Sequence, residues 1–279
     1  MRLGTRGSAL ALVQARAVAG ALGADTEIVE IVTGGDRGVV GDKARWIDTI
    51  EDALERGEID LAVHSAKDVP AGALLRPGMT VAAVLGREDA RDALVGAGSL
   101  DEVPAGARVG TASLRRRAQL LAVRDDLEVV EVRGNVDTRL RKLDDGACDA
   151  LVLAAAGLRR LGREERIGAL LDPAVFVPAP GQGILAVEGR AIPEGIVDRE
   201  AQRALAIERA AVEALDATCD TPIGMHFDGE ALHAFVGLPD GSVWIRDRVV
   251  ADDPAPLIVA RLESMGAREL LARAAGASS

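Results

Sequence analysis

Two pairs of segments in the first half of the chain resemble each other, and this internal echo is the strongest constraint on the fold. The segment Arg2–Ser8 reads RLGTRGS and reappears as Arg108–Ser113, RVGTAS, with one residue deleted and a glutamine six residues after each serine. The segment Leu54–Asp60 likewise resembles Leu143–Asp149, and an apolar run follows both. Echoes this short also arise by chance. Because two of them occur in the same order, we interpret them as two lobes with a common strand–helix plan.

The first lobe is expected to begin with a strand and an N-capped helix. Ser8 is a favourable N-cap, and the residues after it are good helix formers up to Leu22. Apolar runs and turn signals place the other elements. These are strands at Arg2–Thr5, Glu27–Val32 and Ile59–Val63, a loop at Thr33–Gly38 and an acidic amphipathic helix at Asp48–Arg56.

The chain is expected to cross between the lobes twice. The first crossing is Arg87–Asp92, and the second lies near Asp172–Gly183, where Val177–Gly183 is too rich in proline and glycine for a regular element. The strand that follows, Ile184–Val187, is expected to return to the first lobe. Two crossings between two α/β lobes describe a hinged cleft like that of type II periplasmic binding proteins.

The C-terminal part of the chain differs in kind. A helix is predicted at Glu200–Leu215, strands at Ala231–Leu238 and Ser242–Val250 around a Pro-Asp-Gly turn, and a closing helix at Pro256–Ala274. This pattern predicts a small α+β domain with an antiparallel sheet. The predicted fold is therefore α/β, with lobe one at 1–86 and 178–197, lobe two at 90–172 and a C-terminal domain at 200–279.

The stretch Leu61–Pro70, LAVHSAKDVP, is the best candidate for a functional site in the first lobe. An apolar strand ends here in polar side chains, and open α/β sheets bind ligands at the carboxyl ends of their strands. The alternative is a capped strand end at which the proline stops the sheet. A catalytic triad of His64, Ser65 and Asp68 is disfavoured, because neighbouring strand residues point to opposite faces and no Gly-x-Ser-x-Gly elbow is present. Lys67 and Asp68 instead suggest a cation that holds an acid group and a carboxylate poised for proton transfer or cation stabilisation.

The second lobe has a different character at the equivalent place. Its strand runs into Ala154–Gly157, AAAG, so this lobe is expected to bind ligands and not to react with them. Ser113 is followed by three arginines, which places cations beside a helix N-terminus, a favourable site for anions. The window Arg108–Lys142 holds nine basic residues against five acidic ones. A bias towards arginine codons explains why most basic residues are arginine, but it does not explain this clustering. The guanidinium group fits carboxylate or phosphate.

Composition limits the remaining functions. The net charge of −11 and the 2% aromatic content argue against nucleic-acid binding. Two cysteines and three histidines make neither a disulfide framework nor a metal-ligand cluster, so no metal is expected. The chain opens without an apolar signal core and holds no run of 18 apolar residues, so we expect a cytoplasmic protein with no membrane partner. Cys219 lies in a loop before Pro222 and is either an inert thiol or a nucleophile and attachment point.

Six motifs in order resemble the hydroxymethylbilane synthase (porphobilinogen deaminase) family over nearly the whole chain. Each is weak alone, but six at compatible spacing are specific. They are Thr5–Ser8 with Gln14, Val63–Pro70, Thr111–Arg116, Arg133–Leu140, Pro180–Gly183, and Glu208-Arg209 followed by Cys219–Gly224.

The resemblance implies an enzyme that joins four porphobilinogens head to tail, releases ammonia each time, and then frees the linear tetrapyrrole by hydrolysis. Enzymes of this family carry a dipyrromethane cofactor bound as a thioether to the cysteine that matches Cys219. Each pyrrole carries an acetate and a propionate. A growing chain of them agrees with a local arginine cluster in an otherwise acidic protein.

The resemblance also implies roles for residues of this chain. Asp68 should face the pyrrole N–H groups as the catalytic carboxylate, Cys219 should hold the cofactor, and His64 should be structural. Eleven further residues should contact the cofactor and substrate, namely Arg6, Ser8, Ser65, Lys67, Thr111, Ser113, Arg115, Arg116, Arg133, Arg139 and Gln182.

Two departures from the family pattern put turnover in question. Ala217 and Thr218 stand where the family usually has two glycines before the cysteine, and glycine permits backbone angles that these residues resist. The segment Lys43–Glu51 keeps an aromatic residue, Trp46, but lacks the family's second lysine. The alternatives to the enzyme are a catalytically impaired paralogue of the same fold and a cytoplasmic binding module for a small anion. As an enzyme, the chain is expected to be a monomer whose partners are porphobilinogen and oligopyrrole intermediates.

Overall fold

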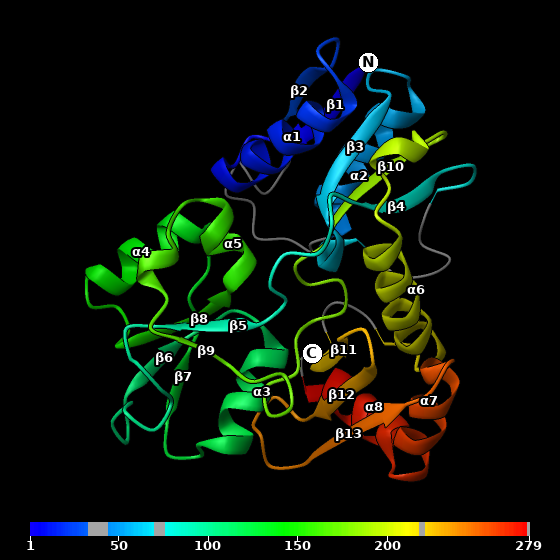
Figure 1. The fold of residues 1–279 in the computed structure, drawn as a ribbon. Helices are drawn as coiled ribbons and strands as arrows, with labels where there is room; N and C mark the ends of the chain where they lie inside the picture. Colours follow the sequence, from blue (N-terminus) through cyan, green and yellow to red (C-terminus); the bar gives the residue numbers. More distant parts are fainter. Residues whose placement is uncertain (33–43, 70–75, 218–220, 278–279) are drawn as a thin grey trace.

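The structure is a computed structural model of the 279-residue chain, and it describes residues 1–32, 44–69, 76–217 and 221–277. These residues form two five-stranded sheets and a three-stranded sheet (Figure 1). The five-stranded sheets are the centres of two α/β lobes, and the third sheet is antiparallel and lies with the last helices. The predicted fold class is confirmed.

Lobe one has the strand order β2-β1-β3-β10-β4. Strands β1, β2 and β3 run parallel, whereas β10 lies antiparallel between β3 and β4, so the chain returns to this lobe as predicted. The strands are Arg2–Arg6 (β1), Glu27–Ile31 (β2), Leu61–Ser65 (β3), Thr80–Val84 (β4) and Leu185–Gly189 (β10), and the helices are Ala9–Leu22 (α1) and Ala44–Glu55 (α2).

The boundaries in lobe one differ from the sequence prediction in two places. Helix α2 begins at Ala44 and not at Asp48, and β3 runs on to Ser65. The pairing of β3 with β10 includes Ser65, which explains the longer strand. Ser8 caps α1 as predicted, since its hydroxyl accepts a hydrogen bond from the N–H of Ala11 (3.4 Å). The predicted loop at 33–38 lies outside the described residues.

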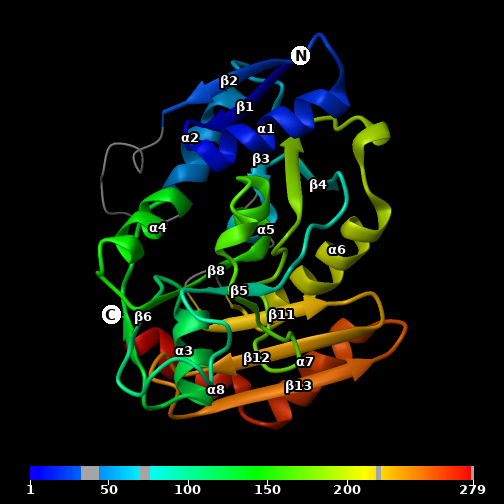
Figure 2. The same ribbon diagram turned by 60° about the vertical axis from the view of Figure 1, so that its left-hand side comes forward.

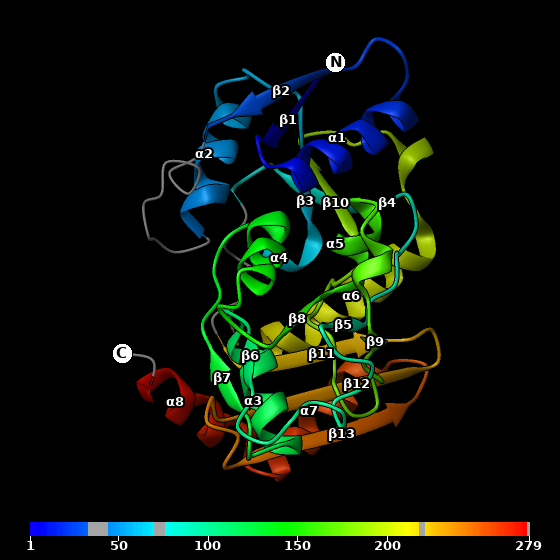
Figure 3. The same ribbon diagram turned by 90° about the vertical axis from the view of Figure 1, so that its left-hand side faces the viewer.

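Lobe two repeats this plan with the strand order β7-β6-β8-β5-β9. Strands β6, β7 and β8 are parallel and β5 is antiparallel to β8, so β5 corresponds to β10 of lobe one. Helices α4 and α5 lie on the side that faces lobe one (Figures 1 and 3). The elements are Asp92–Val95 (β5), Arg108–Gly110 (β6), Glu128–Val130 (β7), Ala150–Ala154 (β8), Ala169–Leu170 (β9), Leu114–Val123 (α3), Val136–Asp144 (α4) and Ala155–Arg160 (α5).

The internal echo of the sequence is confirmed at the level of single contacts. The N–H of Arg2 donates to Asp60 Oδ2 (2.7 Å), and its guanidinium group donates to Oδ1 (3.0 Å). In lobe two, the N–H of Arg108 donates to Asp149 Oδ2 (2.8 Å), and its guanidinium group donates to Oδ1 (2.8 Å). Each aspartate thus fixes the start of the first strand of its lobe against the third.

The C-terminal part contains strands Ile223–Phe227 (β11), Ala231–Gly237 (β12) and Trp244–Val250 (β13) and helices Arg199–Ala214 (α6), Pro254–Ser264 (α7) and Ala267–Ala277 (α8). The predicted hairpin is confirmed, but β11 was not predicted as a strand. The prediction of one closing helix was wrong. Gly266 has a φ of 91°, which an α-helix does not accommodate, and the chain therefore divides into α7 and α8.

Helix α6 connects lobe one to the C-terminal sheet. It packs on β4 and on β11, and Figure 2 shows it running between the two sheets. One buried apolar cluster therefore spans both parts. It begins in lobe one with Ala83 and Ile184, continues through Leu205 of α6, and ends in the C-terminal sheet with Met225 and Val236. Within the described ranges, no helix is both long and apolar enough to cross a bilayer.

Candidate active site

The reactive stretch predicted from the sequence lies at the carboxyl end of β3. The strand is buried between β1 and β10, and a 3-10 turn at Ala66–Asp68 follows it directly. The N–H of Ala66 donates to the carbonyl group of Ile184 (3.0 Å), which ties the turn to the residue directly after the second crossing. Lys67 and Asp68 are therefore held half-buried at the end of a strand, the position at which open α/β sheets bind ligands.

A cavity of about 110 Å³ lies beside this turn. Nε2 of Gln14 donates to Oγ of Ser65 (3.0 Å) across it, so α1 and β3 are joined by their side chains. The cavity combines a cation, a carboxylate and hydroxyl groups, which together suit a ligand with both acidic and N–H groups. The polar residues that line it are Arg6, Ser8, Gln14, His64, Ser65 and Asp68.

His64 and Ser65 interact with different partners. Nε2 of His64 lies 3.2 Å from Oε2 of Glu188, which is fully buried in β10, whereas Ser65 contacts Gln14. The described side chains of His64, Ser65 and Asp68 therefore do not form the triad that the sequence disfavoured. The His64–Glu188 contact supports a structural role for His64.

Lobe two contributes two buried arginines that share one carboxylate. Asp92 is the first residue of β5 and is fully buried. Its Oδ2 accepts from Arg115 (2.7 Å) and its Oδ1 accepts from Nε of Arg116 (3.0 Å). Burial alone would raise the pKa of Asp92, but the charges of Arg115 and Arg116 outweigh it and hold the pKa well below its ordinary range. Two guanidinium groups on one carboxylate leave a net positive charge.

Arg116 and Arg139 of lobe two lie within electrostatic range of Asp68 in lobe one. Burial and repulsion from Arg116 lower the pKa of Arg139 to about 10, and the attraction of Asp68 opposes them. Burial likewise lowers the pKa of Arg116, against the attraction of Asp92 and Asp68. Both arginines stay charged at neutral pH. The structure thus brings the predicted catalytic carboxylate together with two partly desolvated cations where the lobes meet.

The hydroxyl groups predicted for lobe two make local contacts. Oγ1 of Thr111 accepts from the N–H of Ser113 (3.2 Å), and Oγ of Ser113 accepts from the N–H of Arg116 (3.4 Å) and caps α3. Thr111 and Ser113 thus hold the first turn of α3, which carries Arg115 and Arg116. Arg133 was also predicted to contact the ligand, but the structure does not place it beside Asp68, Arg116 and Arg139. Its side chain is 63% exposed and pairs with Glu131 (2.6 Å).

The sequence reasoning missed two residues, of which Asp92 contacts predicted site residues and Arg160 contacts the second crossing. Asp92 opens a fully buried strand, and an acidic residue in that position requires a buried cation, which is a signal that the sequence did contain. Arg160 ends α5 and donates to the carbonyl group of Gly183 (2.6 Å). Burial lowers the pKa of Arg160, and Glu88 opposes that effect. Arg160, the second of two arginines that follow Ala154–Gly157, gave no signal in the sequence comparable to that of Asp92.

The predicted attachment residue, Cys219, lies outside the described residues, as does Thr218. The chain before it is described. Asp216 has a φ of 53° and is the left-handed residue at the end of α6, while Ala217 is buried and has no positive φ. Alanine therefore causes no backbone strain at the first of the two positions where the family usually has glycine.

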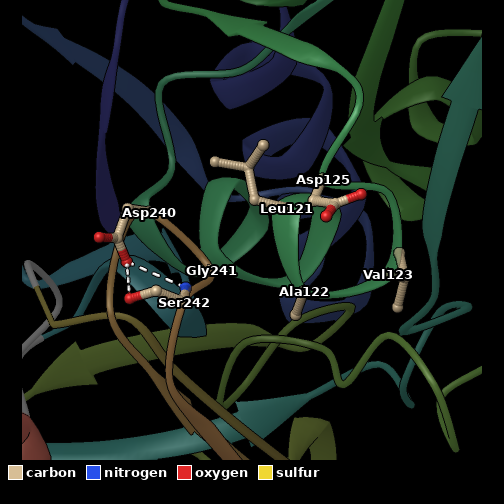
Figure 4. Close-up of a pocket in the computed structure, with 7 residues that line it drawn as sticks. All are labelled: Leu121, Ala122, Val123, Asp125, Asp240, Gly241 and Ser242. Carbon is tan, nitrogen blue, oxygen red and sulfur yellow. Dashed lines mark hydrogen bonds between the residues drawn. The ribbon is translucent and has the colours of Figure 1, made fainter. Parts of the chain in front are cut away.

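A larger hollow of about 520 Å³ lies elsewhere, between the end of α3 and the β12–β13 turn (Figure 4). There Asp240 accepts hydrogen bonds from the N–H (3.0 Å) and hydroxyl (2.7 Å) groups of Ser242. Its lining includes the carboxylates Asp125 and Asp240 and, among the described residues, no basic side chain. It therefore does not suit an acidic ligand, and the smaller cavity beside Asp68 is the better candidate.

Comparison with known proteins gives one family. The family model described as "Porphobilinogen deaminase, dipyromethane cofactor binding domain" matches residues 1–198. Porphobilinogen deaminase of Roseiflexus sp. (strain RS-1) is 44% identical over 299 residues, which cover 97% of this chain and 98% of that protein. Porphobilinogen deaminase of Roseiflexus castenholzii is 43% identical over 300 residues, which cover 98% of each. This chain therefore belongs to the porphobilinogen deaminase family.

Proposed function

We propose that this protein is a hydroxymethylbilane synthase. It condenses four porphobilinogen molecules head to tail with loss of ammonia, and it then releases the linear tetrapyrrole by hydrolysis. The observation that carries the proposal is the position of Asp68 within electrostatic range of Arg116 and Arg139, two partly desolvated cations of the opposite lobe. A substrate with carboxylates on one side and a pyrrole N–H on the other matches this distribution of charge.

The basic residues around Asp68 fit an acidic pyrrole cofactor. Arg115 and Arg116 outnumber their buried partner Asp92, and Arg139 lies beside them, so lobe two has positive charge left for the acid groups of a ligand. When bound through Cys219, the dipyrromethane group supplies the pyrrole end on which the product is built. The residues proposed to hold its carboxylates and those of the substrate are Arg6, Lys67, Arg115, Arg116 and Arg139, with Arg133 reaching them only if it leaves Glu131.

Hydroxyl groups complete the proposed site. Ser8 and Ser65 line the cavity beside Asp68. Thr111 and Ser113 hold the first turn of α3, where Arg115 and Arg116 begin. Each charge-assisted contact between an arginine and a carboxylate contributes about 1.5–3 kcal/mol net. Several such contacts offset the repulsion between an acidic ligand and a chain of net charge −11.

Asp68 is proposed to act by charge. As the amino group of the porphobilinogen aminomethyl side chain leaves as ammonia, positive charge develops on the methylene carbon that remains and on the pyrrole nitrogen. A carboxylate fixed on a rigid 3-10 turn beside that pyrrole stabilises this charge without reorganising. Removal of the proton displaced in the next condensation is a second task that the same carboxylate can perform.

The remaining assignments are part of the same proposal. The chain is proposed to work as three units, at 1–86 with 178–197, at 90–172 and at 200–279. The separate sheets of these segments support that division. The protein is also proposed to act in the cytoplasm as a monomer, without nucleic-acid or membrane partners. The net charge of −11 supports the exclusion of nucleic acid.

Denaturing mass spectrometry of the purified protein tests the proposal. An active enzyme should carry a mass excess of two pyrrole units on Cys219, and it should consume porphobilinogen with release of ammonia. The same modification without consumption would indicate a catalytically impaired paralogue, as the changes at 43–51 and 217–218 allow. An unmodified chain that binds small carboxylates without turnover would indicate an anion-binding module and would contradict the enzyme.

A further inference from the structure

One buried carboxylate joins residues from both crossings and both lobes. Oδ1 of Asp92 accepts from Nε of Arg116 (3.0 Å) and from Nε2 of Gln182 (2.9 Å), and Oδ2 accepts from Arg115 (2.7 Å). Asp92 is the last residue of the first crossing, and Gln182 lies in the second. Both side chains are fully buried, so no exchange with water loosens these contacts.

The neighbours of Gln182 decide the orientation of its amide. Nε2 faces two groups that can only accept, the carboxylate of Asp92 (2.9 Å) and the carbonyl group of Ala90 (2.7 Å). Oε1 must therefore face the opposite way, where it accepts from Nζ of Lys67 (3.4 Å). A flipped amide would set its oxygen against two acceptors and its NH₂ group against an ammonium group. The amide has one acceptable orientation.

We propose that Asp92 is a positioning residue that couples the two lobes. It fixes the guanidinium groups of Arg115 and Arg116 in lobe two, and through the amide of Gln182 it sets where the ammonium group of Lys67 lies in lobe one. Gln182 then acts on Lys67 and not directly on the ligand. The inference rests on the proposed function, in which these cations hold the acid groups of cofactor and substrate.

The chain offers a matched control for Gln182. Gln119 is also a fully buried glutamine, and its amide bonds with the backbone of Val177 (3.0 and 2.6 Å). Replacing either glutamine with methionine keeps a side chain of similar length and removes one buried amide. Only the variant at Gln182 removes a contact with Lys67.

The first test observes Lys67 directly and needs no activity. The chain has three lysines, Lys43, Lys67 and Lys142, so reductive methylation with ¹³C gives few signals, and the variant Lys67→Arg identifies the one from Lys67. Gln182→Met is expected to shift this signal and its pH titration, while Gln119→Met leaves both unchanged. An unchanged Lys67 signal in Gln182→Met, or an equal shift in Gln119→Met, would overturn the proposal.

The role of Asp92 is tested by the same signal. Asp92→Asn is expected to reproduce the shift seen with Gln182→Met. Because this variant leaves two buried guanidinium groups without a counter-ion, it is paired with a charge-free background in which Asp92→Leu is combined with Arg115→Leu and Arg116→Ala. If either Asp92→Asn or the triple variant folds and its Lys67 signal is not shifted, the proposed role of Asp92 is wrong.

A double-mutant cycle separates positioning from general damage. Gln182→Met should lower kcat/KM for porphobilinogen about tenfold, the effect of one charge-assisted hydrogen bond. Combined with Lys67→Met, it should cost no more than Lys67→Met alone, whereas additive losses would show that Gln182 does not act through Lys67. Wild-type turnover is measured alongside. An inactive wild-type protein with the Lys67 shift intact contradicts the proposed function and leaves the contact standing.

Discussion

Lobe one and lobe two share one backbone plan but place their charged side chains on different elements. After β3, lobe one carries Lys67 and Asp68, and the equivalent positions after β8 are Ala156 and Gly157. Both segments are held alike. The N–H of Ala66 donates to the carbonyl group of Ile184, directly after the second crossing (3.0 Å), and the N–H of Ala155 donates to the carbonyl group of Arg91 in the first crossing (3.1 Å). The same support therefore presents reactive side chains in one lobe and inert ones in the other.

The opposite holds at the helix that follows the first strand of each lobe. Arg115 and Arg116 in α3 correspond to Leu10 and Ala11 in α1. The crossing strand shows the same exchange, since Asp92 pairs with Ala154 in lobe two as Leu185 pairs with Ser65 in lobe one. Buried arginines for binding require a buried carboxylate, and lobe two supplies both. The difference supports the proposal that lobe one reacts and lobe two binds.

The largest expected effect comes from replacing Asp92 of β5 with leucine, the residue that β10 of lobe one has at the equivalent position, Leu185. Asp92→Leu leaves Arg115 and Arg116 buried without a counter-ion, which is expected to cost about 3–5 kcal/mol in the free energy of unfolding measured with urea. Adding Arg115→Leu and Arg116→Ala should restore most of that stability, because a buried ionic group replaced by apolar side chains is often neutral. A triple variant no more stable than Asp92→Leu would show that the lobes differ by more than these residues.

Acid titration sharpens the same contrast. The pKa of Asp92 lies below its unfolded value of about 3.9, so its stabilisation is complete above that value and is lost as the pH falls towards the folded pKa. The free energy of unfolding of the wild-type protein should therefore fall more steeply between about pH 5 and pH 2 than that of the triple variant. Parallel curves would contradict the role of Asp92 as the carboxylate that stabilises lobe two.

A smaller effect is expected from a single arginine of lobe two that is proposed to bind the ligand. Arg139→Gln should raise KM for porphobilinogen about tenfold or more, because one charge-assisted contact contributes about 1.5–3 kcal/mol. Arg141 lies on the same helix, α4, and is exposed, so Arg141→Gln provides the control and should leave KM within about twofold. Steady-state kinetics of both variants decide the matter. Equal changes would mean that the charge of α4 acts at long range.

The smallest effects belong to the contacts that the lobes have in common. Asp60 and Asp149 make the same bonds with Arg2 and Arg108, and these bonds lower the pKa of both exposed carboxylates. Asp60→Asn and Asp149→Asn should therefore each lower the melting temperature slightly, by similar amounts, and without effect on kcat. A large difference between the two melting temperatures would indicate that the lobes do not have equivalent frames.

The sequence predicted the parts of this structure that depend on local patterns. The echo between Arg2–Ser8 and Arg108–Ser113 predicted two lobes because capped helices and short apolar strands are encoded locally. It did not predict the break at Gly266, since an isolated glycine inside a helical pattern is tolerated and does not by itself mark the end of a helix.

The site was predictable only where one segment carries it. The turn with Lys67 and Asp68 lies directly after its strand, so the sequence indicated it. The pairing of Asp92 with Arg115 and Arg116 joins residues more than twenty positions apart, and the contact of Gln182 with Lys67 joins the second crossing to the turn after β3. Such contacts depend on the tertiary fold, and no local pattern shows which residues will pair. For the same reason, the motif that contains Arg133 did not show that this side chain lies exposed beside Glu131.

The most direct test of one-sided catalysis compares equivalent positions after β3 and β8. Asp68→Ala removes the carboxylate of lobe one, while Gly157→Ala adds a methyl group in lobe two that meets Leu10 at an ordinary 3.7 Å. Porphobilinogen consumption and the mass of the extended enzyme are measured for both. The account predicts that Asp68→Ala binds porphobilinogen but does not extend the chain, and that Gly157→Ala turns over like the wild-type protein. Near-normal extension by Asp68→Ala would contradict it.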